Sequence, residues 1–224
     1  MITLEAKNLT KYYGTSPNIV RALDGIDLEI ASREFVAVIG QSGSGKSTLL
    51  HMLGGLDTPT DGKVIVGGQE LSKMKDEQLT IFRRRNVGFV FQSFNLIPIL
   101  SVYENIVLPI ELDGGSIDEP FVDEIIKALG LLEKRDAMPN QLSGGQQQRV
   151  AIARALAAKP SIILADEPTG SLDTKTGQDV LEALKATSMQ FGQTIVMITH
   201  NEHIARLADR VIHIQDGKVK GGVA

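Results

Sequence analysis

The chain has 224 residues, 42% of them hydrophobic, and its 23 basic and 27 acidic side chains leave a formal net charge of −4. An acidic balance argues against general nucleic-acid binding, which needs lysine and arginine to displace counterions. The lack of cysteine excludes disulfide scaffolds, thiol catalysis and cysteine-bound metal clusters. No apolar run approaches the ~20 residues of a bilayer span, and residues 1–5 do not resemble a signal peptide. We therefore expect one large domain that meets a membrane only through a partner.

Strand and helix patterns alternate along most of the chain. Residues 2–30 show a largely alternating β-pattern with a turn at 12–18, and the segment 95–140 contains only helical patterns, at 101–112 and 118–129. Further strands are expected at 35–39, 63–66, 87–91, 161–165, 194–198 and 210–214, and further helices at 46–56, 76–85, 146–158, 175–190 and 202–208. Asp216-Gly217 is typical of a hairpin turn. The order predicts an α/β fold with a mostly parallel sheet, an N-terminal antiparallel β subdomain and a helical insertion.

A glycine-rich turn follows the apolar strand 35–39. Residues 40–47, Gly-Gln-Ser-Gly-Ser-Gly-Lys-Ser, match the full G-x-x-x-x-G-K-[ST] pattern of a phosphate loop. Its glycines let consecutive N–H groups face phosphate oxygens, and the next helix presents its positive end. An ordinary turn would explain the glycines but not the Lys-Ser pair at this register. We predict a P-loop NTPase core whose nucleotide-binding residues are Gly40, Ser42, Gly43, Ser44, Gly45, Lys46, Ser47 and Thr48.

Two acids end a second apolar strand. Asp166 follows residues 162–165 and is expected to hold Mg²⁺ together with the Ser47 hydroxyl. Glu167 comes next, before Pro168, where a carboxylate can orient or deprotonate the attacking water. Two exposed acids at a strand end would be the simpler interpretation if no phosphate loop were present. Because the chain has a complete phosphate loop, we predict Glu167 and Lys46 as catalytic residues and MgATP as the ligand.

A second helix start also suits an anion. Leu142-Ser143-Gly144-Gly145-Gln146 places an N-cap serine and two glycines before the helix 146–158. The chain has only one lysine-bearing loop and one Asp-Glu pair, so this second site has no nucleotide machinery of its own. We predict that it faces the γ-phosphate held by a second copy, with two ATP molecules between head-to-tail subunits.

These motifs, in this order, resemble the ATP-binding subunit of ABC transporters over nearly the whole chain. The resemblance implies a single domain over 1–224, with a RecA-like core plus β subdomain at 1–94 and 141–224. It implies a helical subdomain at about 95–140 that continues into the signature helix to about 158. It also implies an integral membrane permease as partner and a peripheral place on the cytoplasmic side of a bacterial inner membrane.

Individual roles also follow from the resemblance. Tyr13 looks like the aromatic that stacks on adenine, although Tyr12 beside it leaves the choice open. Gln92 looks like the switch-loop glutamine that approaches Mg²⁺ and has a catalytic role. Asp173 looks like the loop aspartate that links the two sites, and His200 like the histidine that touches the γ-phosphate and orients Glu167. The resemblance assigns the contact with the partner's nucleotide to Ser143, Gly144, Gly145 and Gln146.

Other segments allow competing interpretations. His200 and His203 have no third ligand nearby in the sequence, which argues against zinc. Arg83-Arg84-Arg85 fits a solvated helix end better than a nucleic-acid patch. The apolar segment 94–100 suits core packing and a groove for a membrane partner's helix equally.

Residues 53–57 and 89–96 look like the subfamily that serves macrolide export, lipoprotein release and antimicrobial-peptide resistance. We therefore predict an export or extraction ATPase. Mechanical signalling through a membrane partner without cargo stays open as the alternative. DNA-repair ATPases rank low because the chain shows no coiled-coil or zinc insertion.

Overall fold

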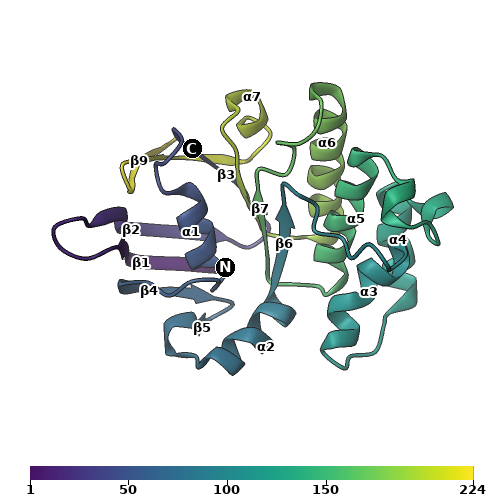
Figure 1. Ribbon diagram of the computed structural model, residues 1–224, viewed down its shortest axis with the longest axis horizontal. Helices are drawn as coiled ribbons and strands as arrows, with labels where there is room; N and C mark the ends of the chain where they lie inside the picture. Colours follow the sequence, from purple (N-terminus) through teal and green to yellow (C-terminus); the bar gives the residue numbers. More distant parts are fainter. Residues whose placement is uncertain (224) are drawn as a thin grey trace.

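The computed structural model describes residues 1–223, and its backbone forms two sheets with helices on both sides of the larger one (Figure 1). The smaller sheet is antiparallel, with strand order β2-β1-β4-β5. Its strands are β1 (Ile2–Tyr13), β2 (Val20–Ala31), β4 (Asp61–Val66) and β5 (Gln69–Glu70). Leu4 of β1 pairs with Ile30 on one side and with Val66 on the other, and all three side chains are buried. The antiparallel N-terminal sheet predicted from the alternation is therefore present.

The larger sheet has six strands in the order β10-β9-β3-β8-β7-β6. They are β3 (Phe35–Ile39), β6 (Val87–Phe91), β7 (Ile162–Asp166), β8 (Ile195–Ile198), β9 (Arg210–Gln215) and β10 (Lys218–Val223). Neighbouring strands from β9 to β6 are parallel, and β10 returns antiparallel after the turn at Asp216 and Gly217. Parallel pairing brings the carboxyl ends of β3, β8, β7 and β6 to one edge, and every motif expected to bind phosphate in this copy follows one of these ends.

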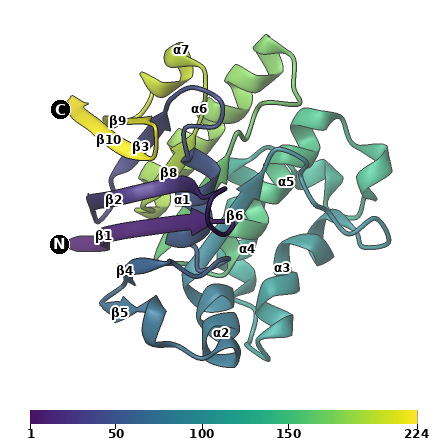
Figure 2. The same cartoon turned by 60° about the vertical axis from the view of Figure 1, so that its left-hand side comes forward.

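Each face of the larger sheet has its own hydrophobic core. Along β3, Phe35, Ala37 and Ile39 join one cluster, whereas Val36 and Val38 join the other. Helix α1 (Lys46–Leu53) and the antiparallel sheet cover the second cluster, while the helices between residues 102 and 191 cover the first. Figure 2 shows the antiparallel strands in front of the larger sheet and the helical layer beside it. A strand buried on both faces must be apolar at every position, which explains the unbroken run at 35–39.

The remaining helices are α2 (Asp76–Asn86), α3 (Val102–Leu112), α4 (Glu119–Ala128), α5 (Gly144–Ala157), α6 (Thr174–Phe191) and α7 (Glu202–Ala205), with short 3₁₀ turns at 71–73, 132–134 and 139–141. Several predicted bounds were wrong. Helix α1 ends at Leu53 because Gly54 caps it and Gly55 takes a positive φ of 63°. Strand β1 continues to Tyr13, and α7 stops at Ala205 instead of residue 208.

The triple arginine at the end of α2 was predicted to be a solvated helix end. It forms the last turn of α2 and Arg85 is exposed, but Arg83 and Arg84 are only partly exposed. Arg84 and Arg85 both bind Asp113 at the end of α3, at 3.4 and 2.8 Å. Arg83 donates to the Gly55 carbonyl at 2.7 Å. The three side chains therefore connect α2 to the helical layer and to the turn after α1.

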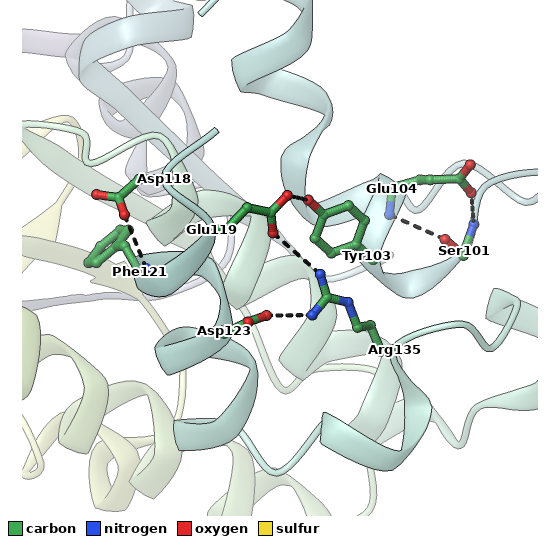
Figure 3. Close-up of polar contacts among 8 residues, drawn as sticks. All are labelled: Ser101, Tyr103, Glu104, Asp118, Glu119, Phe121, Asp123 and Arg135. Atoms are coloured by element: carbon green, nitrogen blue, oxygen red, sulfur yellow. Dashed lines mark hydrogen bonds and ion pairs between the residues drawn. The ribbon is translucent and has the colours of Figure 1, made fainter. Parts of the chain in front are cut away.

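A polar cluster ties together the first turns of the helical layer (Figure 3). The Arg135 guanidinium lies 4.2 Å from the Tyr103 ring centroid and also contacts Glu119 and Asp123 of α4. The Tyr103 hydroxyl donates to Glu119, and the backbone N–H of Tyr103 donates to the Arg135 carbonyl. These contacts fix α3, α4 and the turn at 132–134 against one another.

Asn105 organises the segment that enters α3. Its side chain is 0% exposed, its Oδ1 accepts from the Ile97 N–H at 2.8 Å, and its Nδ2 donates to the carbonyls of Ile97, Leu100 and Ser101. One amide thus satisfies four backbone groups of a segment that has no regular secondary structure. The shape of residues 97–101 therefore depends on this side chain.

We expect Asn105→Leu to lower the free energy of unfolding by about 2–4 kcal/mol, because the Ile97 N–H and the Leu100 carbonyl lose the partner that the buried Asn105 amide supplies. Urea denaturation followed by circular dichroism measures the loss. The same change at the exposed Asn140 is the control and should stay within about 0.5 kcal/mol of wild type. Equal stability of the two variants would contradict the role of Asn105.

Candidate nucleotide-binding site

The loop at residues 40–47 folds as the glycine pattern predicts. Gly43 and Gly45 take positive φ values of 77° and 104°, and a Cβ at Gly45 would collide with the Ala22 carbonyl. Helix α1 starts at Lys46 with no side-chain cap, so the first N–H groups of the helix remain available to an anion. The Lys46 ammonium is nearly buried and donates to the carbonyls of Gly40 and Gln41, at 2.8 Å each.

A cavity of about 510 Å³ opens beside this loop. Its lining includes Ser42, Gly43, Gly45, Lys46, Ser47, Thr48, Glu167, His200 and Tyr13. The Tyr13 hydroxyl donates to Asp57 at 2.9 Å, and the Lys11 ammonium lies 4.9 Å from the Tyr13 ring centroid. Tyr12 instead donates to Asp24 at 2.5 Å and is not among the described residues that line the cavity. The geometry therefore favours Tyr13 of the two tyrosines as the aromatic neighbour of a base.

A second cavity of about 410 Å³ collects the predicted magnesium residues. It is lined by Ser47, Gln92, Asp166 and Glu167, among others. A hydroxyl, an amide oxygen and a carboxylate are hard oxygen donors, the ligand type that Mg²⁺ requires. The side chains present thus fit the ion, and they come from the start of α1 and the ends of β6 and β7.

Glu167 occupies a strained position at the end of β7. Its φ is 45°, an uncommon value for a residue with a side chain, and its N–H donates to the Ile198 carbonyl at 3.1 Å. His200 Nδ1 lies 3.1 Å from Glu167 Oε1, although 69% of the histidine side chain is exposed. The two residues predicted to act on water are therefore in direct contact.

The segment 169–173 packs closely against Gln92. The Ser171 hydroxyl donates to the Gln92 carbonyl at 2.7 Å, and a Cβ at Gly170 would lie 2.9 Å from Gln92 Cδ. Gly170 is thus a site residue that the sequence did not single out. A glycine is needed there because the Gln92 side chain comes close to the Gly170 backbone. The sequence does not show this approach, since it depends on the pairing of β6 with β7.

The second predicted anion site lies on the helical layer. Ser143 caps α5 by accepting from the Gln146 N–H at 3.3 Å, and Gln146 Oε1 accepts from the Ser143 N–H at 2.9 Å. Asp173 caps α6 in the same way through the Thr176 N–H at 3.1 Å. Over the described part of the chain, no residue from 142 to 146 lines either cavity.

Comparison with known proteins adds independent support. A family model described as ABC transporter matches residues 23–170. The uncharacterized ABC transporter ATP-binding protein MJ0796 of Methanocaldococcus jannaschii is 47% identical, over 97% of this chain and 95% of its own length. A solved structure described as a dimeric post-hydrolysis state of the ATP-binding cassette MJ0796 bound to ADP and Pi is 44% identical, with a TM-score of 0.86 over 98% of this chain and 97% of that one.

The chain belongs to the ABC transporter family. Among other relatives, the macrolide export ATP-binding/permease protein MacB of Chlorobaculum tepidum is 48% identical over 96% of this chain but 33% of its own length. The bacitracin export ATP-binding protein BceA of Halalkalibacterium halodurans is 43% identical over 98% of this chain and 87% of its own length. The predicted family, the P-loop fold and the ATPase class of this cassette are confirmed.

Burial raises the pKa of the Asp166 carboxyl of the cassette above its ordinary value, and the neighbouring Glu167 raises it further. His51, Lys46 and the Ser47 hydroxyl act in the opposite direction. In the unfolded chain the Asp166 carboxyl keeps its ordinary, lower pKa. The free energy of unfolding therefore falls as the pH rises from the pKa of the unfolded chain through the raised pKa of the folded chain, because the folded state holds the ionised carboxylate at a cost. A bound cation would offset that cost.

We expect Asp166→Asn to raise the melting temperature at pH 7 in the presence of EDTA while abolishing ATP hydrolysis, because it removes a partly buried charge that Mg²⁺ would need. The gain in melting temperature should shrink as the pH falls, because the raised pKa lets the wild-type carboxyl take up its proton and lose its charge. Thermal unfolding monitored between pH 4 and 8 tests this. A variant with a melting temperature below that of wild type at every pH would contradict the expected stabilisation.

We expect Tyr13→Ala to weaken ATP binding about tenfold, the order of one base–aromatic stack, while Tyr13→Phe stays near wild type. Tyr12→Ala is the matched control and should leave the affinity unchanged. Titration with a fluorescent ATP analogue compares the three variants. A larger loss for Tyr12→Ala than for Tyr13→Ala would reverse the assignment.

Proposed function

We propose that the chain hydrolyses MgATP between two copies of itself and uses their closure to drive a membrane permease in export or extraction. One observation carries the proposal. The chain holds two helix starts suited to anions, at Lys46 and at Ser143, but only the first lies beside the cavities that contain Asp166 and Glu167. The second helix start therefore needs a nucleotide that another copy holds.

Within one copy, the loop at 40–47 supplies N–H groups to the phosphates. Lys46 exchanges its two carbonyl partners for β- and γ-phosphate oxygens, an exchange that the charge of the phosphate favours. Ser47, Asp166 and Gln92 are the proposed ligands of Mg²⁺, which neutralises charge that develops on the phosphates. Tyr13 lies where it can stack on the adenine.

Glu167 and His200 act on the attacking water. Glu167 accepts its proton or fixes its direction, and the contact at 3.1 Å lets His200 hold the carboxylate and also reach the γ-phosphate. Phosphoryl transfer needs positioning and charge stabilisation more than covalent help. Donors from Ser143, Gly144, Gly145 and Gln146 of a second copy would complete the shell around the γ-phosphate, so hydrolysis requires the closed dimer.

The dimer proposal has support from a relative. Solved structures of MJ0796 are described as dimeric, one of them with ADP and Pi bound. Asp173, beside Glu167 and His200 on the wall of a cavity of about 340 Å³, is the proposed link between the two sites. Loss of the γ-phosphate would remove the charge that holds the copies together.

The permease proposal rests on the segment 94–100 and on two relatives. Leu96 packs against the core, whereas Ile99 is 80% exposed beside the start of the helical layer, which supports core packing by one part of the segment and a partner contact by another. The described residues include no helix long and apolar enough to cross a bilayer. The relative named export ATP-binding/permease protein extends well beyond the part that this chain matches. An exposed apolar contact in the segment that follows Gln92 in the chain would let a separate permease sense the nucleotide.

We expect Glu167→Gln to lower the hydrolysis rate at least about a hundredfold, the range for loss of a general base, while ATP binding is retained. ATP should then shift the variant to a dimer on size-exclusion chromatography with light scattering. Lys46→Ala is the control and should lose both ATP binding and the dimer. Full turnover by Glu167→Gln, or by wild-type protein that stays monomeric throughout, would refute the proposal.

A further inference from the structure

Gln148 of α5 has a polar side chain with no access to solvent. It is 0% exposed, and it lies one helical turn beyond the cap at Ser143. Its Nε2 donates to the Pro168 carbonyl at 2.6 Å and to the Phe91 carbonyl at 3.2 Å. Both amide hydrogens are thereby used on backbone groups outside the helical layer.

The two carbonyls flank the proposed catalytic residues. Phe91 immediately precedes Gln92, and Pro168 immediately follows Glu167. Phe91 and Asp166 are paired neighbours across β6 and β7. The Gln148 amide therefore bridges the ends of the two strands that present Gln92 and Glu167.

The orientation of this amide follows from its partners, because the reversed amide would place its oxygen against two carbonyls. Gln148 Oε1 consequently points to a place where the described residues offer it no partner. Burying an acceptor without a partner costs free energy, and an apolar side chain of similar length would avoid that cost. An amide in spite of this cost indicates that its two donated bonds matter here.

Arg154 holds the other side of Gln92 from the same helix. Its guanidinium donates to the Phe94 carbonyl at 2.9 Å and to the Asn95 carbonyl at 2.6 Å. Phe94 and Asn95 both take positive φ values, 56° and 51°, so this backbone needs external support. Burial lowers the pKa of Arg154, and within residues 1–223 no carboxylate forms an ion pair with it. Helix α5 thus bonds to the backbone before and after Gln92.

We propose that Gln148 is a positioning residue that couples the start of α5 to the catalytic edge of the sheet, resting on the roles proposed for Gln92 and Glu167. Ser143 and Gln146 form the first turn of α5, and Gln148 sits on the next turn. When that first turn engages the nucleotide of a second copy, Gln148 sets where Glu167 and Gln92 stand relative to it. Each copy's α5 would thereby bring its own catalytic residues into register as it binds the partner's ATP.

The test is Gln148→Met, which keeps the length of the side chain and removes both donors. We expect the catalytic rate constant to fall between about tenfold and a hundredfold, the cost of a small misplacement, while ATP affinity stays at the wild-type value because the loop at 40–47 is untouched. Thr187→Val is the matched control: it removes a fully buried hydroxyl that bonds only within α6 and should keep wild-type turnover.

A second measurement separates positioning from loss of folded protein. In a Glu167→Gln background, Gln148→Met should lower the residual rate by a smaller factor than in wild type, because the part of its effect that acts through Glu167 is already lost and only the part through Gln92 remains. If Gln148→Met does not fold, Gln148→Asn, which keeps the amide but is one methylene shorter, takes its place in both measurements. Faster backbone hydrogen exchange at 92–95 and 169–170, with the rest of the chain unchanged, is the expected physical signature.

Wild-type turnover by Gln148→Met, or multiplication of its effect with that of Glu167→Gln, would overturn the inference. Failure of the proposed function has a different signature, because it would show in wild-type protein that does not hydrolyse ATP or in Glu167→Gln with full activity.

Discussion

Backbone pairing between the parallel strands β3, β8, β7 and β6 brings four strand ends to one edge of the larger sheet. The phosphate loop, His200, the Asp-Glu pair and Gln92 each continue one of these ends. These segments are far apart in the sequence, and few of their side chains touch one another directly. The site therefore depends first on the register of a buried sheet, and a shift of one residue in any strand would turn its terminal residue away from the others.

The same edge concentrates energetic costs. Glu167 takes a strained φ, Asp166 carries a raised pKa, and the nearly buried Lys46 ammonium donates to two backbone carbonyl oxygens. Groups of this kind destabilise the free protein, and a bound anion and cation relieve them. The two cores on either side of the sheet supply the stability against which these costs are set. The chemistry of the site is thus built from groups that a purely structural edge would avoid.

The sequence predicted most of this edge because its signals are local. Strands 35–39 and 87–91 have the predicted bounds, since an apolar run is interrupted at both ends by polar or glycine residues. The end of α1 was misplaced although Gly54 and Gly55 are a local stop signal, whereas the end of α7 was misplaced because Arg206, Leu207 and Ala208 remain compatible with a helix. Gln148 and Arg154 gave no signal, since their partners are backbone carbonyls 57 and 60 positions away. Tyr12 and Tyr13 could not be separated until β1 was placed against β2.

The two separate cores also bear on how such a chain can change over time. Alternate residues of one strand belong to different cores, so a substitution on the helical side of β3 leaves the packing around α1 untouched. The helical layer can therefore vary in sequence without disturbing the packing on the side of the sheet that carries α1. Change in the helical layer and constancy on the side of the phosphate loop would both follow from the one sheet that separates the two cores.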